Sequence, residues 1–141
     1  KGGVAYRDLL PEQQAPNLGT QGMGNYGLDW FDDNQLWWTP HEDGAAVKLR
    51  LPAPADGKYK ISGRFTHARD YGKIQLIVNG KEVGSPVDLY NDDKVIAVDH
   101  EVGIAELKKG QNELVLKIVG KNEKSTGYLA GINYLILTPV E

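Results

Sequence analysis

The aromatic side chains near the start of the chain are the first candidates for chemistry. The stretch NQLWWTP, residues 34–40, holds Trp37 and Trp38 side by side in a chain with only 3 Trp. Neighbouring side chains of a β-strand point to opposite faces, so one ring can be buried while the other faces outward. Trp30 stands among acidic residues in DWFDD, and we expect it to be exposed. Flat aromatic faces suit the C–H faces of sugars, whereas core packing is the competing interpretation at each position.

Two further stretches combine charged groups with an aromatic ring. THARDYG, residues 66–72, contains Arg69, Asp70 and Tyr71 in succession. A guanidinium fork pairs with planar or vicinal oxygens, so this trio suits recognition of sugar hydroxyls or carboxylates. The competing interpretation is an Arg–Asp pair that pins a loop, with Tyr71 as its plug. DLYNDD, residues 88–93, adds Tyr90 and Asn91 as polar contacts, although Asn-Asp-Asp is also ordinary turn chemistry.

Motifs typical of enzymes are missing from the sequence. Glycoside hydrolysis uses two carboxylates, but 19 acidic residues supply some close pair by chance. There is no Gly-x-Ser-x-Gly, His-Glu-x-x-His or P-loop pattern. The 3 histidines, His41, His67 and His100, are far apart in sequence and lack metal-ligand spacing. We therefore expect that the protein is not an enzyme and has no catalytic residues; a small lyase or glycosidase is the weakest interpretation.

Composition narrows the function further. With 141 residues, 40% hydrophobic and 25% charged, the chain is typical of one globular domain with its own core. The net charge of −3 gives no basic field for nucleic acid, and no apolar run approaches the ~18 residues of a membrane helix. The absence of cysteine excludes disulfides and thiolate chemistry. No signal peptide is present, and the opening KGG suggests a domain cut from something longer.

From residue 45 onward, the sequence alternates with the period of a β-strand. In AAVKLRL, Val47, Leu49 and Leu51 fall on one face, opposite Lys48 and Arg50. The same alternation recurs in GKYKISGRF, KIQLIVNGKEVG, NELVLKIVG and GINYLILTP. These segments predict short strands, each with an apolar face toward a core and a polar face toward solvent.

Turn residues punctuate these strands. Asn79-Gly80 is a strong hairpin signal, because both positions of the tight turn need a positive φ. Six or seven short strands separated by such turns predict an all-β fold, an antiparallel β-sandwich. We expect a single domain over residues 1–141. In it, the Gly-rich, aromatic residues 1–44 wrap an edge or end, and residues 45–138 form the strand core.

Five short motifs carry a family resemblance that spans roughly residues 34–138. They are QLWW (35–38), DGKY (56–59), DYG (70–72), VNG (78–80) and GINY (131–134). With them, the chain resembles the accessory β-sandwich domains of bacterial carbohydrate-active enzymes. These are galactose-binding-like jelly rolls that include carbohydrate-binding module families 6 and 35. The chain is also similar to the C-terminal sandwich found with the DUF2961 glycosidase group.

The resemblance implies a function as well as a fold. It implies a non-catalytic carbohydrate-binding module that targets a covalently attached glycan-degrading enzyme to a polysaccharide or oligosaccharide. It also implies a secreted, extracellular or periplasmic bacterial protein. Some members only brace a neighbouring domain, so the alternative is a structural accessory domain that packs against a catalytic domain or oligomerises it. The motifs themselves specify architecture better than ligand.

Under the first interpretation, the site residues divide into stacking rings and polar contacts. We expect Trp30 and one of Trp37 and Trp38 to stack on sugar. The polar contacts would come from Arg69, Asp70, Tyr71, Tyr90 and Asn91. Families 6 and 35 usually begin with a Glu-rich strand that supplies ligands to a structural calcium, and KGGVAYRDLL lacks it. A structural Ca²⁺ is therefore an open expectation, with oxygens available from Asp32, Asp33, Asp92 and Asp93.

Overall fold

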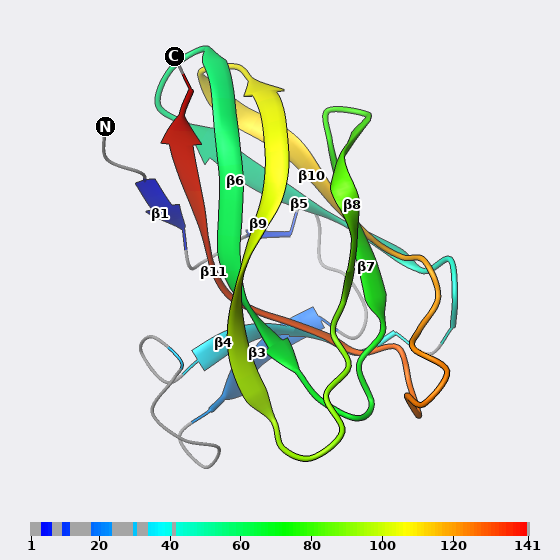
Figure 1. Ribbon diagram of the computed structural model, residues 1–141. Coiled ribbons are helices and arrows are strands. Elements are labelled where there is room, and N and C mark those ends of the chain that lie inside the picture. Colours follow the sequence, from blue (N-terminus) through cyan, green and yellow to red (C-terminus); the bar gives the residue numbers. More distant parts are fainter. Residues whose placement is uncertain are drawn as a thin grey trace.

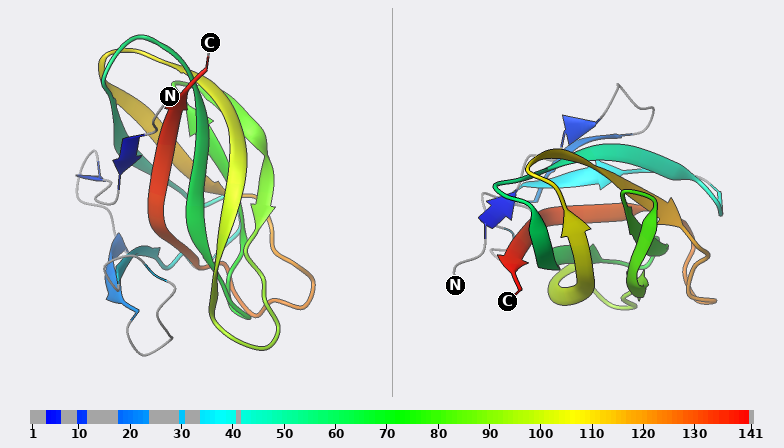
Figure 2. Two further views of the ribbon diagram at one scale, coloured as in Figure 1. Left: turned by 60° about the vertical axis from the view of Figure 1, so that its left-hand side comes forward. Right: turned by 90° about the horizontal axis from the view of Figure 1, so that it is seen from above.

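Two antiparallel sheets packed face to face make up the molecule (Figures 1 and 2). This computed structural model describes residues 4–6, 10–11, 18–23, 30, 34–40 and 42–140. In that part of the chain, every regular element is a β-strand. The expected antiparallel β-sandwich is therefore confirmed. Over the same residues, no helix has the length and apolar character to cross a membrane.

Each sheet draws its strands from distant parts of the chain. The six-stranded sheet has the order β3 (Leu18–Gly22), β4 (Asn34–Trp38), β11 (Ala130–Pro139), β6 (Gly57–His67) and β9 (Ile96–Leu107), with β1 (Val4–Tyr6) also paired to β11. The five-stranded sheet has the order β2 (Leu10–Pro11), β5 (Ala46–Ala53), β10 (Gly110–Ile118), β7 (Lys73–Val78) and β8 (Lys81–Asp88). From β4 onward, the chain changes sheet at every connection except the β7–β8 hairpin, which is the path of a jelly roll.

The core lies between the sheets and follows the predicted alternation. In β5, Val47, Leu49 and Leu51 are buried, and the lysine and arginine between them are exposed. Leu49 pairs with Leu114 of β10. The other fully buried side chains include Ile61, Phe65, Ile74, Leu76, Leu116, Ile118, Leu135 and Leu137. Each side chain of this kind stabilises the fold by about 1.5–3 kcal/mol through its removal from water.

The predicted Asn79-Gly80 hairpin is also present. Asn79 has φ 49° and Gly80 has φ 84°, as a two-residue hairpin turn between β7 and β8 requires. The Asn79 side chain adds a second function. Its Nδ2 donates to Asn112 Oδ1 at 2.9 Å, and its Oδ1 accepts the Glu113 N–H at 3.0 Å. The turn is thereby anchored to β10.

A backbone contact closes the seam between the two free edge strands, β8 and β9. Gly84 of β8 has φ 65°, and a Cβ added there would overlap the carbonyl oxygen of Val102 in β9. A Cβ added at Gly103 would lie 2.8 Å from the Gly84 nitrogen. The buried Gln75 side chain donates to the Val83 carbonyl at 3.1 Å and supports the bend in β8. The sheets can therefore touch only because glycine stands at this crossing.

The first and last strands meet at one end of the sandwich. Val4 of β1 pairs with Leu137 of β11 in an antiparallel register, so β1 begins beside the end of β11. In Figure 1, this end is uppermost, and the β6–β7 and β8–β9 connections lie at the other end.

We predict that Gly84→Ala destabilises the fold more than the matched control Gly80→Ala. Both residues have positive φ, which costs a non-glycine residue about 1–2 kcal/mol. Space around Gly80 is open, whereas a Cβ at Gly84 overlaps Val102, so Gly84→Ala carries an additional steric penalty. Urea denaturation of both variants measures the difference. Equal losses of unfolding free energy would contradict the backbone crossing.

Candidate binding site

Three connections meet at one end of the sandwich, which we call the three-loop end (Figure 1). They are residues 68–72 between β6 and β7, residues 89–95 between β8 and β9, and residues 119–129 between β10 and β11. The Ala68 N–H donates to the Leu89 carbonyl at 2.9 Å, and the Asn91 N–H donates to the Ala68 carbonyl at 3.2 Å. The Leu129 N–H donates to the Asp70 carbonyl at 3.1 Å. Main-chain bonds therefore tie the three loops together.

A buried hydroxyl completes this attachment. Ser125 Oγ donates to the Tyr71 carbonyl at 2.7 Å, and the Thr126 N–H donates to the Arg69 carbonyl at 2.9 Å. A Cβ added at Gly127 would lie 2.8 Å from the Asp70 carbonyl oxygen. The β10–β11 connection is thus held close against the β6–β7 connection, and side chains that leave these loops start from a fixed backbone.

Arg69 and Asp70 reach this end without pairing with each other. Arg69 is exposed and Asp70 is half-buried. Within the described residues, no ion pair joins them, so the interpretation of an Arg–Asp pair that pins the loop is wrong. The backbone bonds hold the loop instead, and the Arg69 guanidinium is left to face solvent.

Tyr90 and Asn91 come to the same end from the β8–β9 connection. The Asn91 amide donates to the Lys94 carbonyl at 2.6 Å, so the expected turn chemistry of this stretch is confirmed. The Tyr90 hydroxyl donates to Asp92 Oδ1 at 3.2 Å. Burial and the Asp92 carboxylate raise the pKa of Tyr90, and the Arg69 charge opposes them. Arg69 and Tyr90 both belong to the three-loop end, on connections that the main-chain bonds of Ala68 join.

Trp30 does not face solvent as expected. Its side chain is 2% exposed, and its Nε1 donates to Thr66 Oγ1 at 2.8 Å. The expectation rested on acidic neighbours in the sequence, whereas the indole is held by a hydroxyl from a distant strand. Trp38 is likewise buried in the core, at 4% exposure. Neither ring is available for a sugar to stack on in this structure.

Trp37 is the member of the tryptophan pair that is partly exposed. It is half-buried, packs against the margin of the core and belongs to the opposite face of β4 from Trp38. Its Nε1 is buried and has no hydrogen-bond partner in the described part of the chain. Of the three tryptophans, Trp37 alone is partly exposed. Sugar contact by this ring stays a prediction.

A buried polar network fixes Tyr71, which the sequence predicts to be a polar sugar contact and which the structure places in the core instead. Gln35 Nε2 donates to the Tyr71 hydroxyl at 3.0 Å and to Gln21 Oε1 at 2.7 Å. Gln35 Oε1 accepts the Thr66 hydroxyl. A Cβ on the neighbouring strand at Gly131 would overlap this amide, so the glycine makes room for it. Tyr71 is 4% exposed, so it supports the site from below and does not present its ring.

The structure also brings together two histidines that are far apart in the sequence. His67 of β6 and His100 of β9 lie in the seam between β8 and β9, with their Nε2 atoms 2.8 Å apart. Sequence spacing gave no signal for this contact, because it depends on the pairing of β6 with β9. Among the described residues, no group of three histidine, aspartate or glutamate side chains is arranged to hold a metal ion.

The acidic residues proposed for calcium divide into two pairs. Asp32 and Asp33 lie outside the described residues. Asp92 accepts the Tyr90 hydroxyl, and no third acidic or histidine side chain joins Asp92 and Asp93 in the described part. Calcium needs 6–8 oxygen ligands, so this pair does not by itself fit the ion. A structural calcium elsewhere in the chain remains a prediction.

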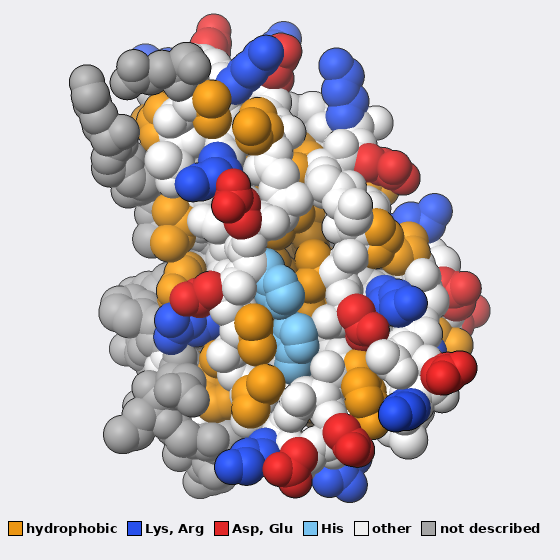
Figure 3. All heavy atoms as spheres, in the orientation of Figure 1, with side chains coloured by type: hydrophobic (Ala, Val, Ile, Leu, Met, Phe, Trp, Pro, Cys, Tyr) orange, Lys and Arg blue, Asp and Glu red, His pale blue; other side chains and the backbone are white. Residues whose placement is uncertain are grey.

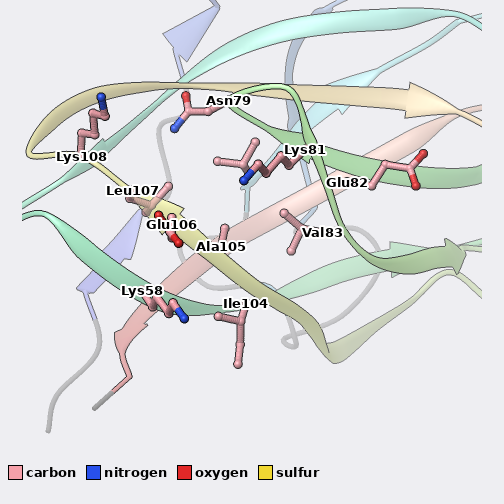
Figure 4. A pocket seen from close by; sticks show the side chains of 11 residues that line it. Lys58, Asn79, Lys81, Glu82, Val83, Ile104, Ala105, Glu106, Leu107 and Lys108 are labelled. Carbon is pink, nitrogen blue, oxygen red and sulfur yellow. The ribbon is translucent and has the colours of Figure 1, made fainter.

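A hollow lies at the end of the β8–β9 seam that is farther from the three-loop end (Figure 4). Its volume is about 430 Å³, within the usual range of small-ligand sites, and it lies between β8 and β9 beyond the Gly84 crossing. Lys58, Lys81 and Lys108 line it, together with Ile104, which is 57% exposed. In Figure 4, Lys81 extends across the hollow while Glu82 points away. None of the site residues expected from the sequence lines this hollow.

Charged groups also gather on the outer face of the six-stranded sheet. Arg64 donates to both carboxylate oxygens of Asp99, at 2.7 and 3.1 Å, and lies 5.6 Å from the centre of the Tyr134 ring. The Arg64 hydrogen bonds hold the pKa of Asp99 below its ordinary value. In this cluster the Arg64 guanidinium and the Asp99 carboxylate are thus paired with each other.

Solved structures share this fold over nearly the whole chain. A xanthan lyase from Paenibacillus matches with a TM-score of 0.83 and 20% identity, over 98% of this chain and 13% of its own. A GH26-CBM35 β-(1,4)-mannanase from Podospora anserina matches with a TM-score of 0.61 and 19% identity, over 99% and 28%. A family 35 carbohydrate-binding module from Clostridium thermocellum matches with a TM-score of 0.58 and 14% identity, over 96% and 98%.

The chain has the fold of the family 35 carbohydrate-binding modules. The expected resemblance is thus confirmed for the fold, since identities of 14–20% are too low to carry more. The chain spans only 13% of the lyase and 28% of the mannanase. In both cases it matches a minor part of a longer protein. No protein-family model and no curated protein matches the sequence.

We predict that Thr66→Val destabilises the fold by about 1–3 kcal/mol, because it leaves the buried Trp30 N–H without its acceptor. The matched control is Thr126→Val, at an exposed threonine, which we expect to stay within about 0.5 kcal/mol of the parent. Urea denaturation measures both. Equal stability of the two variants would contradict the role assigned to the buried network.

Proposed function

We propose that this chain is a non-catalytic carbohydrate-binding module whose glycan binds at the three-loop end. The observation that carries the proposal is the convergence of Arg69, Asp70, Tyr90 and Asn91 on one backbone-bonded surface. The fold supports it, because the family 35 modules that match over nearly their full length are carbohydrate-binding by description. Attachment to a secreted glycan-degrading enzyme is part of the same proposal.

The roles of the side chains follow from their chemistry. Arg69 is exposed and presents a planar fork of N–H donors, which can bridge two neighbouring sugar oxygens. Asp70 accepts hydrogen bonds from hydroxyls, and the half-buried Tyr90 ring offers an apolar edge beside them. The backbone bonds between the loops hold these groups in place before the ligand arrives, which lowers the entropy lost on binding.

The proposal differs from the sequence-based expectation in which side chains contact the glycan. With Trp30, Trp38 and Tyr71 buried, polar contacts from the loops carry recognition, and Trp37 is the remaining tryptophan that can add a stacked ring. Hydrogen bonds to a charged donor contribute about 1.5–3 kcal/mol each, so replacement of Arg69 should weaken glycan binding strongly.

A second candidate function is a structural accessory domain that packs against a catalytic domain. The observation that favours it is Ile104, a large apolar side chain that is 57% exposed on a free edge strand. Exposed apolar groups on an edge strand invite pairing with another protein surface. The lysines around the same hollow would then form the polar rim of the contact.

For the glycan site, we predict retardation of the chain in affinity electrophoresis through gels that contain xylan, pectin, glucomannan, β-glucan or alginate. Arg69→Ala should weaken binding by about tenfold or more, which corresponds to about 1.4 kcal/mol, without loss of stability. Lys108→Ala, at the opposite end, is the matched control and should bind like the parent. Runs with EDTA test the calcium expectation. Free migration through every gel would contradict the proposal.

For the accessory domain, we predict self-association in size-exclusion chromatography that grows with protein concentration and disappears in Ile104→Thr. Threonine keeps the β-branched shape and removes apolar surface. A monomer at every concentration for both chains would contradict this second candidate.

A further inference from the structure

His67 and His100 meet end to end in the seam between β8 and β9. Their Nε2 atoms are 2.8 Å apart, the ring centres are 5.0 Å apart and the ring planes differ by 11°. The Nε2 contact has the length of a hydrogen bond and is too short for two rings stacked face to face. The rings therefore share nearly one plane, with a single proton between the two nitrogens.

The direction of this hydrogen bond follows from a second contact. His67 Nδ1 lies 3.4 Å from the Tyr90 carbonyl oxygen, which can only accept. His67 Nδ1 must therefore carry a proton, and in a neutral ring its Nε2 is then the acceptor. His100 Nε2–H is the donor. A chain of hydrogen bonds thus runs from β9 through β6 to the backbone of the β8–β9 connection.

Two side chains hold the Tyr90 backbone, His67 at its carbonyl and Asp88 at its N–H. The Tyr90 carbonyl faces His67 Nδ1, and the Tyr90 N–H donates to Asp88 Oδ1 at 3.0 Å. Asp88 is fixed in turn by Asn122, whose Nδ2 donates to its Oδ2 at 3.0 Å. His67 is accordingly a positioning residue for the loop that presents Tyr90 and Asn91.

Both histidines can exchange protons with solvent. Figure 3 shows histidine side chains at the surface, in the middle of the face formed by β9 and β8. A hollow of the seam is lined by His100 together with Asp88 of β8 and Glu101 of β9. The acidic groups around the pair are thus Asp88, Asp99 and Glu101, and the Phe65 ring packs edge-on against His100.

Burial keeps the pair neutral at pH 7. Burial and then the charge of His100 lower the pKa of His67 below its ordinary 6.5, while the Tyr90 carbonyl and Asp88 act in the opposite direction. Burial also lowers the pKa of His100, and Asp99 opposes this shift. Since the closed pair takes up protons at lower pH than free imidazoles, acid favours the open arrangement, and the change begins as pH falls below 6.5.

We propose that the His67–His100 pair makes ligand binding at the three-loop end depend on pH. This inference rests on the proposed function of that end. A first proton goes to the free Nδ1 of His100 and preserves the N–H···N bond. A second proton places N–H groups on both Nε2 atoms and two like charges at 2.8 Å, so the rings separate. Tyr90 then loses its His67 contact, and the loop loosens at Tyr90 while the main-chain bonds of Ala68 still hold it.

The first test is glycan affinity as a function of pH, using the polysaccharide that retards the chain. We expect constant affinity above about pH 6.5 and a loss of about tenfold or more as the solution is made acidic. His100→Gln keeps an N–H donor for His67 but cannot take a second charge, so its affinity should match the parent at neutral pH and change little in acid. An unchanged acid loss in His100→Gln would overturn the inference.

A second readout needs no glycan. The backbone amide NMR shifts of Tyr90 and Asn91 should move with a midpoint below pH 6.5 in the parent and stay still in His100→Gln. That movement supports the pH switch even if no polysaccharide binds. In that outcome the proposed glycan binding fails, while the effect of the histidine pair on the loop holds. Glycan binding with unmoved shifts would overturn the switch and leave the proposed function intact.

Discussion

The buried amide of Gln35 is the interaction on which the site end of the molecule depends. One side chain of β4 reaches Tyr71, Thr66 and Gln21, and through Thr66 it fixes the Trp30 indole. An amide buried without partners costs several times what one hydrogen bond contributes, so these groups are committed to one another. The β6–β7 connection is consequently seated on a polar core, and the exposed Arg69 projects from a fixed base.

Local patterns in the sequence determine much of this fold. The alternation in β5 and the positive φ at Asn79-Gly80 depend on neighbouring residues only, and both are correct. The convergence of Arg69 and Tyr90 does not follow from such patterns, because it depends on main-chain bonds between the β6–β7 and β8–β9 connections. Nor does the burial of Trp30, because its partner Thr66 is 36 residues away. The His67–His100 contact depends likewise on strand pairing, which no local pattern encodes.

The seam between β8 and β9 is closed where Gly84 meets Val102, and a hollow lies on each side of this contact. Gly84 crosses the β9 backbone, so the hollow near His100 and the hollow near Ile104 are separated. One is lined by His100, Asp88 and Glu101, and the other by three lysines, two glutamates and the exposed Ile104. A sheet edge that is closed at a single crossing can thus serve two chemically different surfaces while the core between them stays packed.

The meeting of β1 with the end of β11 has a consequence for how the molecule can be used as a building block. Because both terminal strands point their free ends away from the three-loop end, a partner fused to either terminus would lie at the opposite end of the sandwich. A bulky partner joined there would therefore stay clear of Arg69 and Tyr90, the groups of the proposed glycan site.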